Sequence, residues 1–165
     1  MSSAGPEARN ASTGTNGLKV VRTTSSDPAF RVLVNDLDRY LAMRNGDAGA
    51  FFAQFNKVDN IQHVVVVHDG DVPVGCGAFK PFGDDAVEVK RMFTSTDHRQ
   101  RGIASLVLNE LEQWARELGF QRCVLETGIM LEDAIALYKK HGYSSIPNYA
   151  QYVGVDSSLC FEKVL

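Results

Sequence analysis

From Leu18 onward the sequence alternates between segments with the period of a β-strand and segments with the period of an α-helix. This alternation limits the fold more than any other feature, because each period fixes which side chains share a buried face. The order β-α-α-β-β-β-α-β-α-β predicts an α/β fold, with a central mixed sheet covered by helices on both faces. The predicted strands are 18–23, 61–68, 72–79, 86–94, 121–127 and 158–164, and the predicted helices are 28–45, 48–55, 102–118 and 131–141.

Two of these predictions rest on strong local signals. Asp69-Gly70-Asp71 separates two apolar runs, and an Asp-Gly pair in that position predicts a β-hairpin. The helix at 102–118 is the clearest, because its apolar residues recur at helical spacing and Gly119 follows as a stop.

The first 17 residues differ in composition from the rest of the chain. They are rich in Ser, Ala, Gly, Thr and Asn without an apolar period, so residues 1–17 are predicted to be a disordered leader. Residues 18–165 are expected to form one domain, because a 165-residue chain is short for two cores. The strand edges that such a fold leaves are compatible with a homodimer.

Charge and cysteine usage exclude several classes of protein. A net charge of −3 argues against a general nucleic-acid-binding protein, and the apolar stretches are too short for a membrane span. The N-terminus also lacks a signal-peptide pattern. Cys76, Cys123 and Cys160 are far apart and form no metal-ligand pattern, so no metal site is expected. Buried free thiols are predicted instead, which fits a reducing, cytoplasmic location.

The segment from Val87 to Ala104 carries the clearest functional pattern. A predicted strand, 87–94, leads through a short basic loop into the long helix, and Gly102 and Ala104 stand where that helix begins. The first turn of a helix offers unsatisfied N–H groups and the positive end of the macrodipole. Small residues let an anion approach this backbone, so the pattern predicts a diphosphate cradle. A helix start that merely contains glycine is the alternative, and neither a Walker loop nor a GxGxxG motif is present.

Here the sequence resembles the GNAT superfamily of acyl-CoA N-acyltransferases. Arg99-x-x-Gly102-x-Ala104 is similar to the family's (Q/R)-x-x-G-x-(G/A) signature, and Leu137-Tyr138-x-x-x-Gly142-Tyr143 to its second signature. One helix and one strand separate the two, as in the family. Leu-Glu-Thr-Gly at 125–128 and Ile-Pro-Asn-Tyr at 146–149 resemble a bacterial-type group within it.

The resemblance implies an acetyl-CoA site along the fourth strand and the start of the long helix. The strand would splay from its neighbour and pair with the pantetheine arm, and the following amides would hold the diphosphate. The departure from the family is Leu131, which stands where many relatives carry Asn or Gln toward the pantetheine. The implied cofactor-binding residues are Met92, Phe93, Thr94, Arg99, Gln100, Arg101, Gly102, Ile103, Ala104, Ser105 and Tyr138.

Transfer of an acetyl group to an amine requires a base for the ammonium and an acid for the leaving thiolate. The resemblance implies Tyr138 as the acid, although a tyrosine at this helical spacing could also be a core residue. Glu88 and Glu126, on the two strands that flank the cofactor, are the candidate bases, and a salt-bridged structural role is the alternative for each. Alternation places Glu88 on one face with Lys90 and Met92.

The acceptor is expected to be a small amine or a protein amine, in contact with Tyr40, Asn56 and Tyr149. Three functions remain open from the sequence. The first is an acetyl-CoA-dependent N-acetyltransferase that acts by direct attack in a ternary complex. The second is a non-catalytic acyl-CoA-binding sensor on the same fold, because the loop motif explains affinity and not chemistry. The third is phosphate-ester or nucleotide binding unrelated to coenzyme A.

Overall fold

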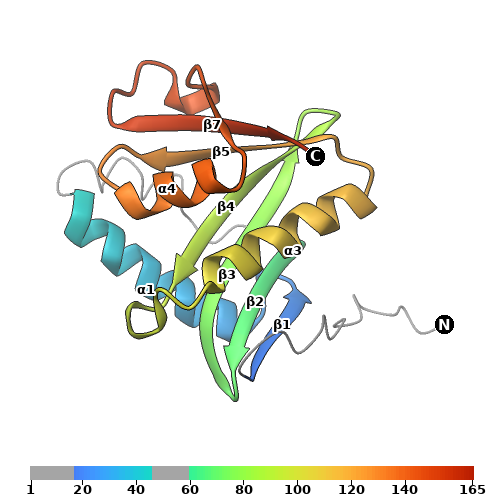
Figure 1. The fold of residues 1–165 in the computed structure, drawn as a ribbon, viewed down its shortest axis with the longest axis vertical. Helices are drawn as coiled ribbons and strands as arrows, with labels where there is room; N and C mark the ends of the chain where they lie inside the picture. Colours follow the sequence, from blue (N-terminus) through green and yellow to red (C-terminus); the bar gives the residue numbers. More distant parts are fainter. Residues whose placement is uncertain (1–16, 46–59) are drawn as a thin grey trace.

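The computed structural model describes residues 17–45 and 60–165, shown in colour in Figure 1. The predicted helix at 48–55 and residues 1–16 of the predicted leader lie outside the described residues. In the described part of the chain, no helix is long and apolar enough to span a membrane.

In the described residues, seven strands form one mixed sheet in the order β1-β2-β3-β4-β5-β7-β6. Among these strands β4 and β5 run parallel, and every other neighbouring pair is antiparallel. The strands are β1 (Leu18–Thr23), β2 (His63–Asp69), β3 (Val72–Phe82), β4 (Ala86–Thr94), β5 (Arg122–Gly128), β6 (Ser144–Ile146) and β7 (Ser158–Val164). The helices are α1 (Pro28–Asn45), α3 (Ile103–Glu117) and α4 (Glu132–Lys140), with 3-10 turns at Thr96–His98 and Ala150–Tyr152.

Most predicted elements are present within one or two residues of their expected ends. The hairpin is confirmed, with Asp69 opposite Val72 and Gly70 at φ 61° in the turn. The three-residue strand β6 was not predicted, because Ser144-Ser145-Ile146 shows no alternation and is a strand only by pairing with β7.

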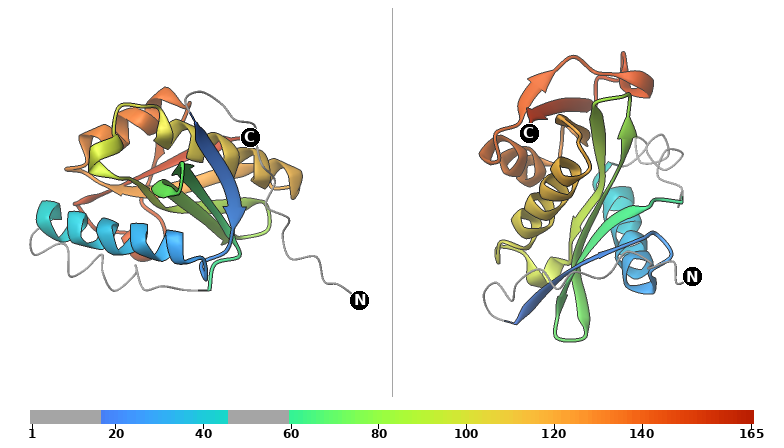
Figure 2. Two further views of the ribbon diagram at one scale, coloured as in Figure 1. Left: turned by 90° about the horizontal axis from the view of Figure 1, so that it is seen from below. Right: turned by 90° about the vertical axis from the view of Figure 1, so that its right-hand side faces the viewer.

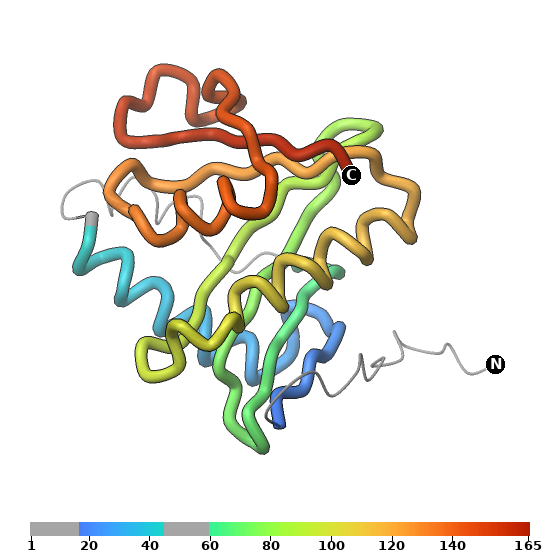
Figure 3. Tube along the Cα trace, viewed as in Figure 1, coloured from blue at the N-terminus to red at the C-terminus, as the bar shows by residue number. Residues whose placement is uncertain are grey.

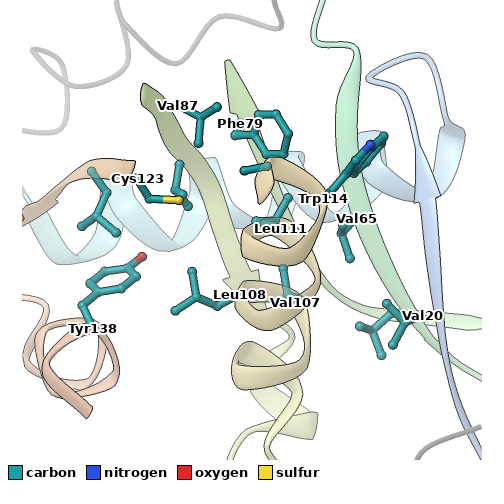
Figure 4. Close-up of a cluster of buried hydrophobic side chains, with 14 of the residues drawn as sticks. Val20, Val65, Phe79, Val87, Val107, Leu108, Leu111, Trp114, Cys123 and Tyr138 are labelled. Carbon is teal, nitrogen blue, oxygen red and sulfur yellow. The ribbon is translucent and has the colours of Figure 1, made fainter. Parts of the chain in front are cut away.

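The helices lie in two layers, with α3 and α4 on one face of the sheet and α1 on the other (Figure 2, right). Each face has its own apolar cluster. On the α3 face Val107, Leu108 and Leu111 pack against Val65 and Leu125, as Figure 4 shows in part. On the α1 face the residues are Phe30, Leu33, Val34, Leu37, Ile61, Val64, Val66, Cys76, Ala78 and Phe93. All three cysteines are buried free thiols, as predicted.

Two glycines of β3 let α3 lie close to the sheet. A Cβ atom at Gly77 would stand 2.5 Å from Met92 Sδ and 2.7 Å from Val107 Cγ1. A Cβ atom at Gly75 would stand 2.4 Å from Ile103 Cγ2, at the first turn of the helix. Since real Cβ atoms do not approach so closely, these positions set the distance at which α3 packs.

A β-bulge at Arg91 corrects one sequence prediction. Arg91 has φ 61°, and the β3–β4 register shifts between Cys76 and Ala78. The extra residue reverses the alternation, so Met92 packs with the α3-face cluster. The prediction that Met92 shares a face with Glu88 and Lys90 is therefore wrong, because alternation alone gives no sign of a bulge.

Candidate active site

The parallel strands β4 and β5 separate part-way along their length. They pair only from Ala86 opposite Arg122 to Val89 opposite Leu125. Beyond that point β4 remains paired with β3 and β5 with β7, and the two traces diverge in Figure 3. The backbone of Lys90–Thr94 thus presents an edge toward an opening instead of toward a neighbouring strand.

A cavity of about 450 Å³ occupies this opening. Its described lining comes from α1, β4, the loop before α3, the first turn of α3, the end of β5 and α4. All of the predicted cofactor-binding residues except Arg101 line it: Met92, Phe93, Thr94, Arg99, Gln100, Gly102, Ile103, Ala104, Ser105 and Tyr138. Leu131, the departure from the family pattern, lines it as well.

The first turn of α3 opens at this cavity with free backbone donors. The Leu106 amide donates to the Gly102 carbonyl at 3.1 Å, which is the first hydrogen bond of the helix. In the described ranges no acceptor contacts the amides of Ile103, Ala104 or Ser105, and Gly102 has no side chain to cap them. Gly102 adopts φ 75°, and a Cβ atom there would meet nothing within 4 Å. An anion therefore has both donors and room at this turn.

The side chains of the loop have other partners. Arg101 forms an ion pair with Asp69 at 2.9 Å, so its guanidinium is directed to the β2–β3 hairpin. The Arg99 guanidinium lies 4.5 Å from the ring centre of Tyr40, and its Nε donates to the Thr94 carbonyl at 3.4 Å. The positive charge of Arg99 thus stays at the cavity wall, between α1 and β4.

Tyr138 extends from α4 into the apolar cluster of the α3 face, where Figure 4 shows it. Its side chain is buried against the rings of Tyr143 and Phe161. Burial raises the pKa of its hydroxyl above the ordinary value, and the charge of Glu126 raises it further. Because its pKa is raised, the hydroxyl remains protonated. It makes no hydrogen bond within the described residues, so it is available at the cavity.

Glu126 is the carboxylate that lines the cavity from β5. Burial raises its pKa to about 7, and the negative charge of Glu88 acts in the same direction. Ser158, Lys90 and Tyr152 oppose this rise. Its Oε1 atom has no hydrogen-bond partner among the described residues. A partly buried carboxylate with a pKa near neutrality can accept a proton at physiological pH.

Glu88, the other candidate base, lies one layer behind the cavity wall. It accepts a hydrogen bond from the Tyr149 hydroxyl at 2.7 Å and faces Lys90 at 3.6 Å. Neither Glu88 nor Tyr149 is among the residues that line the cavity. Glu88 acts on Glu126 through its charge.

The residues predicted for the acceptor are not all brought together. Tyr40 lines the cavity from α1, Tyr149 does not, and Asn56 lies outside the described residues. Sequence reasoning missed Arg44 and Lys90, which also line the cavity. One sequence signal pointed to Lys90. It stands two residues after Glu88, on the same face of the strand that leads into the loop motif.

Comparison with known proteins agrees with this geometry. The sequence model of the Acetyltransferase (GNAT) family matches residues 28–143 of this chain. The chain belongs to the GNAT acetyltransferase family. Among GNAT relatives, it is 31% identical to the IAA acetyltransferase of Azospirillum brasilense over 156 residues, which cover 90% of this chain and 98% of that protein. It is 37% identical to the uncharacterized N-acetyltransferase YsnE of Bacillus subtilis over 95 residues, which cover 56% of this chain and only 62% of YsnE.

Solved GNAT-type structures share the fold. A Klebsiella pneumoniae protein described as an acyl-CoA N-acyltransferase superposes with a TM-score of 0.75 at 26% identity, covering 90% of this chain and 97% of that one. A GNAT family acetyltransferase from Elizabethkingia anophelis, with acetyl-CoA bound, gives a TM-score of 0.65 at 14% identity, covering 91% and 99%. The mixed sheet with helices on both faces is therefore the GNAT fold, as the sequence predicted.

Proposed function

We propose that this protein transfers the acetyl group of acetyl-CoA to a primary amine by direct attack in a ternary complex. One observation carries the proposal: a single cavity joins the free amides of the first turn of α3 to the partly buried carboxylate of Glu126 and the hydroxyl of Tyr138. The bound acetyl-CoA of the Elizabethkingia anophelis neighbour supports the choice of donor. The three buried free thiols are compatible with a reducing, cytoplasmic location.

The residues present suit acetyl-CoA. The amides of Ile103, Ala104 and Ser105 would hold the diphosphate, because they lack protein acceptors and lie at the positive end of α3. The exposed backbone edge at Met92–Thr94 would pair with the pantetheine amides, as a further strand would. An N–H of that edge would also stabilise the oxygen of the thioester carbonyl as it becomes negative.

Glu126 is proposed as the general base and Tyr138 as the general acid. The acceptor enters as an ammonium, loses a proton to Glu126 directly or through a water, and its nitrogen attacks the acetyl carbon. The C–N bond forms, the C–S bond breaks, and the Tyr138 hydroxyl gives a proton to the departing thiolate. The second proton of the attacking nitrogen then restores the neutral Tyr138, and Glu126 releases its proton to solvent. The raised pKa values of both groups suit these roles, since each holds the required proton state near pH 7.

Membership of a bacterial-type subgroup is part of the proposal. The Leu-Glu-Thr-Gly segment at 125–128 supplies Glu126, and the Ile-Pro-Asn-Tyr segment at 146–149 supplies the tyrosine that binds Glu88. The two segments thus supply the proposed base, Glu126, and the tyrosine that anchors Glu88.

The test is thiol release from acetyl-CoA in the presence of a broad panel of amines, with CoA binding measured by calorimetry on the same preparation. We expect tight CoA binding together with thiol release that depends on at least one class of amine. Binding without amine-dependent release across the panel would favour the sensor, and a preference for ATP over CoA would contradict both.

A further inference from the structure

The opening between β4 and β5 has two chemically different sides. Val89 and Leu125 belong to the apolar cluster under α3, so Lys90 and Glu126, the next residues on each strand, face the side of α1. The diphosphate turn and Tyr138 lie with α3 and α4. The α1 side is therefore left for the acceptor. We call it the acceptor chamber, and its described wall contains Tyr40, Arg44, Lys90, Arg91, Glu126 and Tyr152.

Positive charge dominates this chamber. Lys90, Arg91 and Arg44 contribute three cations, and Glu126 is the only acid in its described wall. Asp133, the other acidic residue of the cavity, belongs to α4 on the opposite side of the opening. A ligand in the chamber thus meets a positive field next to one carboxylate that is half protonated near neutrality.

Glu88, the carboxylate next to Lys90, does not approach it closely. Lys90 is only 13% exposed, and its Nζ atom stands 3.6 Å from Glu88 Oε1, beyond an ordinary hydrogen bond. Glu88 uses its other oxygen for Tyr149. Burial of a cation is costly unless an anion approaches it closely, so a ligand carboxylate at Lys90 would be favoured.

We propose that the acceptor is a small amine that also carries a carboxylate, an amino acid or a closely similar zwitterion. The inference rests on the proposed function and names its substrate class. The carboxylate binds Lys90, with Arg91 and Arg44 adding to the field, while the amino group lies at Glu126. Lys90 and Glu126 lie close enough to interact electrostatically, so the two groups of one small molecule can reach both.

The charge pattern disfavours polyamines and lysine-rich peptides. Each would bring a second positive charge into a chamber that already holds three cations, and like charges in a poorly solvated site repel strongly.

The experiment compares each of the common amino acids with its own carboxamide as the acceptor, using thiol release from acetyl-CoA. The two members of a pair have nearly the same size but differ in the pKa of the amine, so the change of their kcat/KM ratio between the wild type and Lys90→Gln isolates the carboxylate charge. We expect at least one amino acid to exceed its carboxamide by roughly 10-fold or more. In Lys90→Gln this ratio should fall toward one, and Lys90→Arg should restore part of it.

The ratio also removes a second effect of Lys90. This lysine acts on the pKa of Glu126, which changes turnover with every acceptor equally and cancels within a pair. Arg44→Gln changes a solvent-exposed side chain in the last turn of α1, at the rim of the chamber, and provides a second variant outside the sheet; it should lower the ratio less. In both variants the dissociation constant of CoA should remain near the wild-type value.

The outcomes separate this inference from the proposed function. Carboxamides, polyamines or lysine peptides that match or exceed the amino acids would overturn the inference and leave the acetyltransferase intact. A Lys90→Gln ratio equal to that of the wild type would overturn the role of Lys90. Absence of thiol release with every amine would instead contradict the proposed function. In that case calorimetry of N-acetylated amino acids with the CoA-saturated protein, compared with their carboxamides, still tests the chamber.

Discussion

Glu88 and Glu126 face the same side of the sheet from the two parallel strands, and the charge of Glu88 raises the pKa of Glu126. Glu88 itself is anchored by the Tyr149 hydroxyl at 2.7 Å. Only one of the two carboxylates lines the cavity, so the other acts on it through the field and not by contact with a ligand. The direction in which the pH profile shifts when a neighbouring charge is removed therefore tests whether Glu126 is the base.

Glu88→Gln should move the activity profile to lower pH. Removal of the negative charge eases ionisation of Glu126, so the rise of kcat/KM expected near pH 7 for the wild type should shift to lower pH. Lys90→Gln removes a positive charge and should move the same rise above pH 7. The check is kcat/KM from pH 5 to 9 for both variants. Shifts in the same direction would mean that Glu126 does not control the profile.

Glu126→Gln should lower kcat roughly 100-fold or more, because a positioned general base contributes about that much. The pH-dependent rise near 7 should also disappear, leaving only the rise that reflects the acceptor's own amine. If the rise near pH 7 persists in Glu126→Gln and kcat stays near the wild-type value, another group accepts the proton. Binding of CoA, measured in parallel, should be unchanged.

The same variant should be more stable than the wild type at alkaline pH. The pKa of Glu126 is raised from 4.5 to about 7, so the folded state binds this proton more tightly than the unfolded state. The stability of the wild type therefore falls as pH rises from 4.5 through 7. Glu126→Gln, which never ionises, should gain on the order of 3 kcal/mol at pH 8 and little at pH 4, measured by urea unfolding. An equal difference at both pH values would contradict the raised pKa.

Tyr138→Phe separates catalysis from packing. The hydroxyl makes no hydrogen bond within the described chain, so its loss should not destabilise the fold. As the acid for the thiolate it should matter, and kcat should fall roughly 100-fold with little change in CoA affinity. Unfolding free energy and single-turnover rates distinguish the two effects. An unchanged rate would leave Tyr138 as a core residue.

Gly102→Glu and Gly102→Ala form a matched pair for the diphosphate cradle. A Cβ atom at Gly102 meets nothing within 4 Å, so Ala adds only the strain of φ 75°, about 1 kcal/mol. Glutamate adds a negative charge and bulk where the diphosphate would lie. We expect CoA affinity to fall at least about tenfold more in the glutamate variant, by calorimetry. Equal affinities would place the cradle elsewhere.

Gly77→Ala tests how β3 positions the long helix. The new Cβ atom would stand 2.5 Å from Met92 Sδ and 2.7 Å from Val107 Cγ1, so these side chains must move. A loss of roughly 1–3 kcal/mol in unfolding free energy is expected. Val107→Ala removes the side chain that it meets, so Gly77→Ala should cost less in that background than alone. Additive losses would show that the overlap is relieved elsewhere.

The sequence alone determined the features that depend on neighbours within a few residues. The periods of 18–23 and 103–117, the Asp69-Gly70 turn and the glycine at the start of α3 are local, so their physical consequences could be derived before any fold was known. The order of strands and helices followed from them.

Tertiary structure alone decided what depends on contacts between distant segments. The β4–β5 ladder ends at Val89, and the bulge at Arg91 moves Met92 to the other face; both depend on pairing between distant segments. Tyr149 reaches Glu88 across 61 positions of the chain. The pKa of Glu126 depends on burial and on charges from other strands, and no local pattern encodes the solvent exposure of a side chain.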